Sequence, residues 1–154
     1  MLTTPQIVET QAQPAAVIHL AVAHSGMREV FGPAVRELMT VLAEQGVEPA
    51  GAVFAHHRRM PAGMFDFEVG VNVCGPVKAA GRVKPGQLPA VTAARAVHSG
   101  PYEGLASAWD AFNSWMKENG HVRAENFWEV YTVGPQSSPN PEDWRTELNS
   151  PLQR

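Results

Sequence analysis

The sequence predicts an α+β fold in which a strand-helix-strand-strand unit is duplicated with pseudo-twofold symmetry, giving a largely antiparallel sheet and two main helices. Three observations predict it. Two segments about 75 residues apart match each other. Each segment contains an amphipathic helix that ends at a glycine, and two strand-like runs follow each helix. A parallel sheet would need a crossover after every strand, so two strands after one helix favour antiparallel pairing.

The match between the two segments extends over a strand and a helix. Residues 14–22 (PAAVIHLAV) align with residues 89–97 (PAVTAARAV) at an offset of 75, with four identities. Residues 24–46 align with residues 98–120 at an offset of 74, with seven more identities. These eleven identities in 32 columns compare with roughly two expected from average residue usage. The agreement predicts an internal duplication.

Both matched segments carry apolar residues at helical spacing. Gly46 and Gly120 follow the two periodic stretches, and glycine best tolerates the left-handed conformation beyond a helix end. We therefore expect two helices with equivalent buried faces. The matched positions are Phe31, Ala34, Val35, Leu38, Val41 and Leu42 in the first copy, and Leu105, Ala108, Trp109, Phe112, Trp115 and Met116 in the second.

Strand-like runs follow both helices. The first helix leads to residues 51–59 (GAVFAHHRR), a turn at 60–63 (MPAG) and residues 64–74, where Phe and Val alternate with polar or small residues. The second helix leads to residues 126–133 (NFWEVYTV) and, after a proline-rich segment, to residues 144–148 (WRTEL). Each half therefore predicts a hairpin.

The length and composition are those of an ordinary globular domain. The chain has 154 residues, of which 44% are hydrophobic and 18% charged. We expect one domain over residues 1–154, with a first repeat over about 5–75, a linker over about 76–86 and a second repeat over about 87–152.

Composition and motif searches exclude several functions. A net charge of −3 and a pI near 6.0 lack the basic surface that direct binding of nucleic acid requires. No window is apolar enough for a membrane span and no signal peptide is recognisable, so we expect a cytoplasmic protein. No metal-ligand spacing or phosphate loop occurs, so no metal or cofactor is expected. Cys74 lies in an apolar run and is expected to be a buried structural thiol.

Four motifs in register resemble one known family. FDFEVGVNV (65–73), LPA followed by HSGPYEGLASAW (88–109), WEVYTVGP (128–135) and WRTELNSPL (144–152) together are similar to the GyrI-like domain. This domain is also the effector-binding domain of AraC-type and multidrug-responsive bacterial transcription activators. The resemblance covers about residues 5–152.

The resemblance implies a ligand groove between the two repeats, where aromatic rings and a buried glutamate receive hydrophobic cations in the drug-sensing members. Some stand-alone relatives act as hydrolases on cyclopropane-containing genotoxic compounds with the same groove, and others inhibit DNA gyrase. The family therefore does not select one activity. This chain shows no helix-turn-helix region before Pro5, so a regulatory role would need a separate regulator as partner. Asn72 stands where the family usually has a proline.

Glu129 is the first candidate for the ligand site. In a strand it shares a face with Phe127 and Tyr131. A carboxylate among rings can attract a cation, to which the rings add cation–π contacts. Alternatively, its pKa rises and it acts as a general acid or base, or it simply pairs with an arginine or a backbone donor.

Two further carboxylates occupy matching places in the two repeats, Glu68 and Glu147. They either line the groove as a symmetric pair or form a cross-strand charge ladder with Arg145.

Three aromatic residues complete the candidate site. Tyr102 opens the second helix where the first copy has Arg28, so a shared core position does not explain it, and it is a second catalytic candidate if the protein is an enzyme. Trp109 and Phe54 either pack in the core or present an edge to the ligand.

The histidines carry no metal prediction. His56 and His57 are adjacent, so in a strand they point to opposite faces, and with Arg58 and Arg59 they predict a solvated basic hairpin edge. His24 and His98 are repeat-related turn residues with an expected structural hydrogen bond.

These features lead to three hypotheses. The first is a stand-alone protein that senses or sequesters a hydrophobic or cationic small molecule. The second is a hydrolase of electrophilic, cyclopropane-containing xenobiotics that uses the same glutamate. The third is a protein-interaction role, such as inhibition of DNA gyrase.

Overall fold

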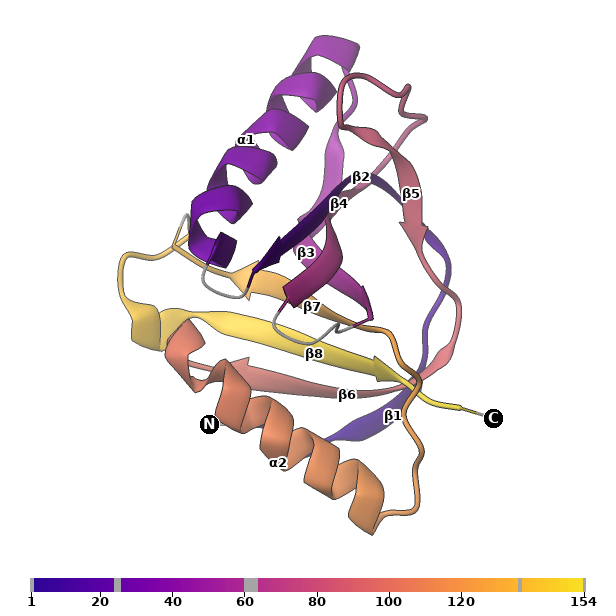
Figure 1. Cartoon of the computed structure of the whole chain (residues 1–154), viewed down its shortest axis with the longest axis vertical. Coiled ribbons are helices and arrows are strands. Elements are labelled where there is room, and N and C mark those ends of the chain that lie inside the picture. Colours follow the sequence, from indigo (N-terminus) through magenta and orange to yellow (C-terminus); the bar gives the residue numbers. More distant parts are fainter. Residues whose placement is uncertain (1, 24–25, 60–63, 136, 154) are drawn as a thin grey trace. The chain divides into compact units, whose positions relative to one another are not determined.

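The computed structural model describes residues 2–23, 26–59, 64–135 and 137–153, without the side chains of residues 27, 28, 58 and 59 (Figure 1). The chain forms two compact units, which we call unit 1 (Met1–Thr10 with Val91–Arg154) and unit 2 (Gln11–Ala90). The expected turn at 60–63 and the expected hydrogen bond of His24 lie outside the described residues. The α+β class with antiparallel strands and two main helices is confirmed.

Unit 2 contains the first helix and an antiparallel sheet in the strand order β3-β4-β2-β5. Its elements are β2 (Gln13–Ala23), α1 (Met27–Gln45), β3 (Pro49–Arg59), β4 (Met64–Val73) and β5 (Lys84–Leu88).

The core of unit 2 follows from the alternation in β4. Phe67, Val69, Val71 and Val73 are buried on one face of this strand, and α1 contacts β4 and β2. The helix contributes side chains one turn apart, so one apolar stripe meets one apolar sheet face. These helix residues are Ala34, Val35, Leu38 and Leu42.

Unit 1 contains the second helix and an antiparallel sheet in the order β1-β6-β8-β7. In Figure 1, α2 lies along the strands of its own unit. The elements are β1 (Gln6–Glu9), β6 (Thr92–Ser99), η2 (Tyr102–Gly104), α2 (Leu105–Glu118), β7 (Phe127–Val133), η3 (Pro141–Asp143) and β8 (Arg145–Pro151).

The core of unit 1 joins α2 to one face of this sheet. Ala108, Phe112 and Met116 recur every four residues on the helix and are buried. They pack against Leu148 of β8 and two alanines of β6, whose small side chains let the helix approach the sheet. This cluster identifies the helix-covered face of unit 1, on which the candidate site also lies.

The two predicted helix ends are confirmed. Gly46 follows α1 with φ 68°, and Gly120 follows α2 with φ 76°. Both values lie in the left-handed region, where a side chain would be strained. The two terminal glycines therefore keep the offset of 74, whereas the helix starts, Met27 and Leu105, do not.

Two short strands were not predicted, and each joins the other repeat's sheet. β1 pairs with β6 although it precedes the first repeat's main strand. β5 pairs with β2 although it begins within the expected linker and ends in the expected second repeat. The compact units therefore differ from the repeats as the sequence delimits them.

Two expectations about individual side chains were wrong. His56 and His57 are 6% and 3% exposed, not a solvated edge, and the His57 ring stacks on Phe67 at 5.0 Å between centroids. Burial follows because His57 lies on the apolar face of the sheet beside that phenylalanine. Cys74 is exposed because it comes just after the last residue of β4.

Gly70 provides the first testable prediction. A Cβ at this position would lie 2.7 Å from Phe54 Cζ, 2.8 Å from Val17 Cγ1 and 2.9 Å from the Ala16 carbonyl oxygen. We expect Gly70→Ala to lower the free energy of unfolding by about 1–3 kcal/mol in urea denaturation, because the methyl group overpacks the sheet. Gly51→Ala is the control, since its nearest neighbour would be 3.7 Å away. Equal stability of the two variants would contradict the prediction.

No helix in the described part of the chain is long and apolar enough to cross a membrane.

Candidate functional site

The carboxylate of Glu129 is held between two neutral donors. It lies in β7, and the residue is only 9% exposed. The Trp109 indole N–H donates to Glu129 Oε2 at 2.7 Å, and the Tyr131 hydroxyl donates to Oε1 at 2.8 Å. Glu129 pairs with Leu148 across the sheet, so both face α2. The helix and the strand together fix the carboxylate in a defined position.

Opposing influences act on the charge of Glu129. Burial raises the pKa of its carboxyl, whereas the hydrogen bonds from Trp109 and Tyr131 and the charge of His98 act to lower that pKa. Burial is the largest of these effects, and the net pKa lies above the usual value for glutamate. The ionised form is therefore costly in the free protein.

Tyr131 begins an aromatic row that leads away from Glu129. The pairing of β7 with β8 shifts register between Val130 and Val133, so Tyr131 lies at a β-bulge, a feature that re-aims side chains. Its ring meets Tyr102 edge-on at 5.7 Å between centroids, and the Tyr102 ring packs against Trp144 at 4.8 Å between centroids, with the two rings tilted by 34°. Burial and the Glu129 charge raise the pKa of both tyrosines, so both hydroxyls stay protonated at neutral pH.

The backbone around Tyr102 is fixed by His98. The ring nitrogen Nε2 of buried His98 donates to the Pro101 carbonyl oxygen at 3.0 Å, which confirms the expected structural hydrogen bond of this histidine. A Cβ at Gly104 would lie 2.9 Å from the His98 ring, and one at Gly134 would lie 3.0 Å from the Tyr102 hydroxyl. Two glycines thus make room for the imidazole and the phenol.

A second aromatic group lies on the other side of Glu129. The Trp109 and Phe127 rings meet at 4.8 Å between centroids, in an edge-on arrangement. The guanidinium carbon of Arg123 lies 5.8 Å from the Trp109 centroid and 5.4 Å from the Phe127 centroid. The Trp109 side chain therefore has two contacts: its N–H binds the Glu129 carboxylate, and its ring lies beneath the Arg123 guanidinium.

Glu147 lies on the opposite face of the same sheet. It pairs with Val130 across β7 and β8, one position away from the Glu129–Leu148 pair, so the alternation of side chains turns it away from α2. Its carboxylate is 3.4 Å from Arg95 Nε and accepts a hydrogen bond from Asn149. The expected ladder partner Arg145 instead donates to the carbonyl oxygens of residues 142 and 144. Glu129 and Glu147 do not share a surface.

The two remaining site candidates belong to unit 2. Phe54 is 1% exposed and packs over Gly70, as the core interpretation predicts. Glu68 is 6% exposed and lies opposite His19 of β2 and His56 of β3. A ligand role for Phe54 and Glu68, and a groove between the repeats, stay predictions.

Sequence reasoning missed three residues of the cluster around Glu129: Trp144, Arg123 and His98, the last of which had only a structural role. Trp144 lies thirteen residues beyond Tyr131 in a proline-rich stretch, and no periodicity links it to Tyr102. Arg123 lies in the irregular segment between α2 and β7. The repeat does give one signal for the site, which is a difference between the two copies. At an offset of 74, the polar-capable Trp109 and Glu129 align with the apolar Val35 and Ala55.

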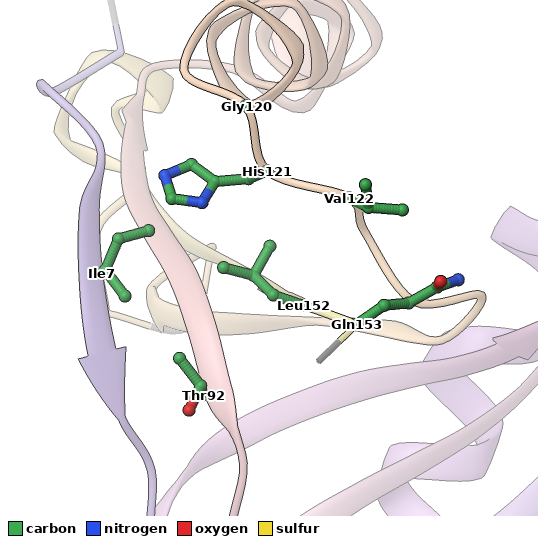
Figure 2. Close-up of a pocket in the computed structure, with 7 residues that line it drawn as sticks. All are labelled: Ile7, Thr92, Gly120, His121, Val122, Leu152 and Gln153. Carbon is green, nitrogen blue, oxygen red and sulfur yellow. The ribbon is translucent and has the colours of Figure 1, made fainter.

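Figure 2 shows a pocket of about 270 Å³ at the C-terminal end of α2, between Ile7 of β1 and the segment that follows the helix. Ile7 and Val122, 42% and 62% exposed, lie on opposite sides of it, and the His121 ring stacks on Trp115. Its described lining includes no acidic or basic side chain other than that imidazole. The pocket therefore lacks the carboxylate that a cationic ligand requires, and Glu129 remains the candidate centre.

Within the described residues, no group of three or more His, Cys, Asp or Glu side chains is placed to hold a metal ion.

Residues 3–153 match the family model of the GyrI-like small molecule binding domain. Among solved structures, the EcmrR C-terminal domain is similar over 98% of each chain, with 21% identity and a TM-score of 0.85. A hydrolase from Listeria innocua is similar over 97% of this chain and 91% of its own, with 14% identity and a TM-score of 0.68. SAV2435 bound to tetraphenylphosphonium is similar over 98% and 94%, with 10% identity and a TM-score of 0.67.

The chain spans 57% of the longer EcmrR chain seen in a complex with DNA, with which it shares 22% identity. No curated protein sequence matches it. At these identities, the likeness to solved structures shows the fold alone.

Proposed function

The chain belongs to the family of GyrI-like small molecule binding domains, and from this premise we propose that it binds a hydrophobic cation at Glu129, as a sensor or a sequestering protein. One observation carries this proposal: a buried carboxylate is satisfied by neutral donors only. In the part of the chain that the structure describes, no Lys, Arg or His side chain forms an ion pair with Glu129.

A buried carboxylate without an ion-pair partner is costly, because hydrogen bonds from neutral groups replace only part of its hydration. A cationic ligand would supply the missing charge. The carboxylate keeps accepting capacity beyond the two bonds from Trp109 and Tyr131, since each oxygen has two lone pairs. The site is thus arranged to gain more from a cation than from a neutral molecule of the same shape.

The rings around Glu129 suit a ligand with aromatic groups of its own. Tyr102, Trp109, Tyr131 and Trp144 are each only partly buried, so part of each residue is exposed to solvent. Cation–π contacts with such rings contribute about 0.5–2 kcal/mol each. Tetraphenylphosphonium, the molecule named with SAV2435, has this chemistry and is a suitable probe.

We expect isothermal titration calorimetry at pH 7.5 to show tetraphenylphosphonium binding at least about tenfold more tightly than neutral triphenylphosphine oxide. The cation should bind more weakly as the pH falls through the raised pKa of Glu129, by about tenfold for each pH unit below it, because protonation removes the charge. Titration in buffers of different ionisation enthalpy should show proton release on binding.

The affinity for the neutral compound is the internal control and should not change with pH in this way. Equal affinities for the two compounds, or an affinity for the cation that stays constant over the whole acidic range in which the protein is folded, would contradict the proposal.

A second candidate function is supported by the raised pKa of Glu129 next to two protonated tyrosines. In an electrophilic cyclopropane, a water molecule could form a bond to one ring carbon while a ring C–C bond breaks. Glu129 would accept the proton of the water and the Tyr102 hydroxyl would protonate the released carbon. The proton on Glu129 would then return to the Tyr102 oxygen through solvent, so that both groups are restored and water is added overall. Turnover that is lost in both Glu129→Gln and Tyr102→Phe would favour this hydrolase, and ligand binding without turnover would favour a sensor.

A further inference from the structure

Arg123 holds a permanent positive charge against the aromatic group that contacts Glu129. Its guanidinium carbon lies 5.4 Å from the Phe127 centroid and 5.8 Å from the Trp109 centroid, and the side chain is half-buried. Nη1 donates to Asn113 Oδ1 on α2 at 2.7 Å. Burial lowers the pKa of Arg123, but a guanidinium stays charged at neutral pH.

This position is the one that a cationic ligand would seek. A guanidinium is planar and weakly hydrated, so it binds ring faces well. The indole beneath it is the same indole whose N–H holds the Glu129 carboxylate. A ligand cation that contacts Trp109 and Phe127 therefore competes with Arg123 for the rings and is repelled by its charge.

We propose that Arg123 is a specificity-determining residue, an internal cation that occupies the Trp109–Phe127 rings and must be displaced before a ligand cation can bind them. This inference rests on the proposed function. It names the ligand class more closely, because only a bulky cation with aromatic groups of its own gains enough contact to displace the arginine, whereas a small alkylammonium ion does not.

The way in which Arg123 is held allows such a displacement. Its described hydrogen-bond acceptor is the side-chain amide of Asn113, a neutral group, and hydrogen bonds to neutral acceptors are about half as strong as those to carboxylates. The long, flexible stem of arginine can also swing away without backbone movement.

The test compares Arg123→Gln, Arg123→Lys and Asn113→Ala with wild type, using tetraphenylphosphonium and tetramethylammonium in calorimetric titrations. We expect Arg123→Gln to bind tetraphenylphosphonium about three- to tenfold more tightly and to bind tetramethylammonium measurably. Asn113→Ala removes the hydrogen-bond acceptor of the arginine but keeps the positive charge. Arg123→Lys also keeps the charge but loses the flat contact with the rings. Both variants should therefore tighten the binding of tetraphenylphosphonium less than Arg123→Gln does. Lys117→Gln, an exposed change on α2 that removes the same charge, is the control and should have little effect.

Thermal unfolding followed by circular dichroism shows which variants are folded. If Arg123→Gln is not folded, Arg123→Lys still provides the test. Equal or weaker binding of tetraphenylphosphonium by folded Arg123 variants would overturn the inference while the proposed function stands. If wild type and all variants bind neither cation, the proposed function itself fails. Tightening of the same size in Lys117→Gln would assign the effect to net charge and would also overturn the inference.

Discussion

Replacing Glu129 with glutamine is expected to weaken the binding of tetraphenylphosphonium at neutral pH by at least about 30-fold, since loss of a buried charged partner costs about 2–5 kcal/mol. The substitution isolates the charge. A glutamine oxygen can accept from the Trp109 indole, and its amide can donate to the Tyr131 hydroxyl, which both donates and accepts. The measurement is a calorimetric titration at pH 7.5 with the neutral triphenylphosphine oxide as reference.

Two further variants make this result specific. Glu125→Gln removes an exposed carboxylate just before β7 and should leave the affinity unchanged. Glu147→Gln removes a carboxylate from the other face of the same sheet, and a loss as large as that of Glu129→Gln would assign the effect to net charge rather than to a site at Glu129. Unaltered cation binding by Glu129→Gln would contradict the proposed function.

The fold of Glu129→Gln is not expected to suffer. Because the folded protein raises the pKa of Glu129, its stabilising contribution exists below the unfolded pKa and is lost as the pH rises through the folded pKa. Burial therefore disfavours the ionised carboxylate, a cost that the neutral amide does not have.

Acidification is expected to remove about 3 kcal/mol from the free energy of unfolding through His57 alone. Burial, with a smaller effect from the neighbouring His56, lowers the pKa of His57 from 6.5 to about 4. A histidine with a depressed folded pKa stabilises the fold above its unfolded pKa, and this contribution is lost as the pH falls from about 6.5 to about 4. Urea denaturation at pH 7.5, 5.5 and 4.5 measures the loss.

His57→Phe removes the titration and keeps a ring beside Phe65 and Phe67. The variant should lose much less stability than wild type between pH 7.5 and 4.5, whatever its stability at pH 7.5. His19→Gln, which changes a histidine whose side chain is 50% exposed, is the control. Parallel pH profiles for wild type and His57→Phe would show that another group controls the acid sensitivity.

The sequence predicts those parts of the fold and site that depend on local periodicity. Alternation in β7 places Phe127, Glu129 and Tyr131 on one face, and the structure joins Glu129 to Tyr131 directly. Helical spacing in the second copy places Trp109 toward the sheet, from where it reaches Glu129. The first relation depends on the geometry of one strand, and the second also on the packing of α2 against the sheet.

Periodicity also explains where the sequence alignment of the repeats goes wrong. At an offset of 75, Val22 is set against Val97, but Val97 pairs with Glu147 on the face away from α2, whereas Ala96 belongs to the core. In unit 2, Val22 pairs with Phe65 on the apolar face. A shift of one residue exchanges the two faces of a strand, so chance identities in a strand can outweigh the correct register.

Contacts between distant segments were beyond prediction. Trp144 meets Tyr102, and Arg123 meets Trp109, only because the loops around β7 return to the helix, and neither loop has a repeating pattern. The strands β1 and β5 were missed because each is short and pairs outside its own repeat. The matching of Glu68 with Glu147 was visible in the sequence, but the burial of Glu68 between His19 of β2 and His56 of β3 was not.

The duplication has left the two copies unequal at the positions that matter most for the proposed ligand. Where the second copy has Trp109 and Glu129, the first has Val35 and Ala55, which can neither donate a hydrogen bond from a side chain nor carry charge. Two equal copies would present two equivalent sites and allow cooperative saturation. With the carboxylate in one copy only, we expect a hyperbolic isotherm and a stoichiometry of one cation per chain.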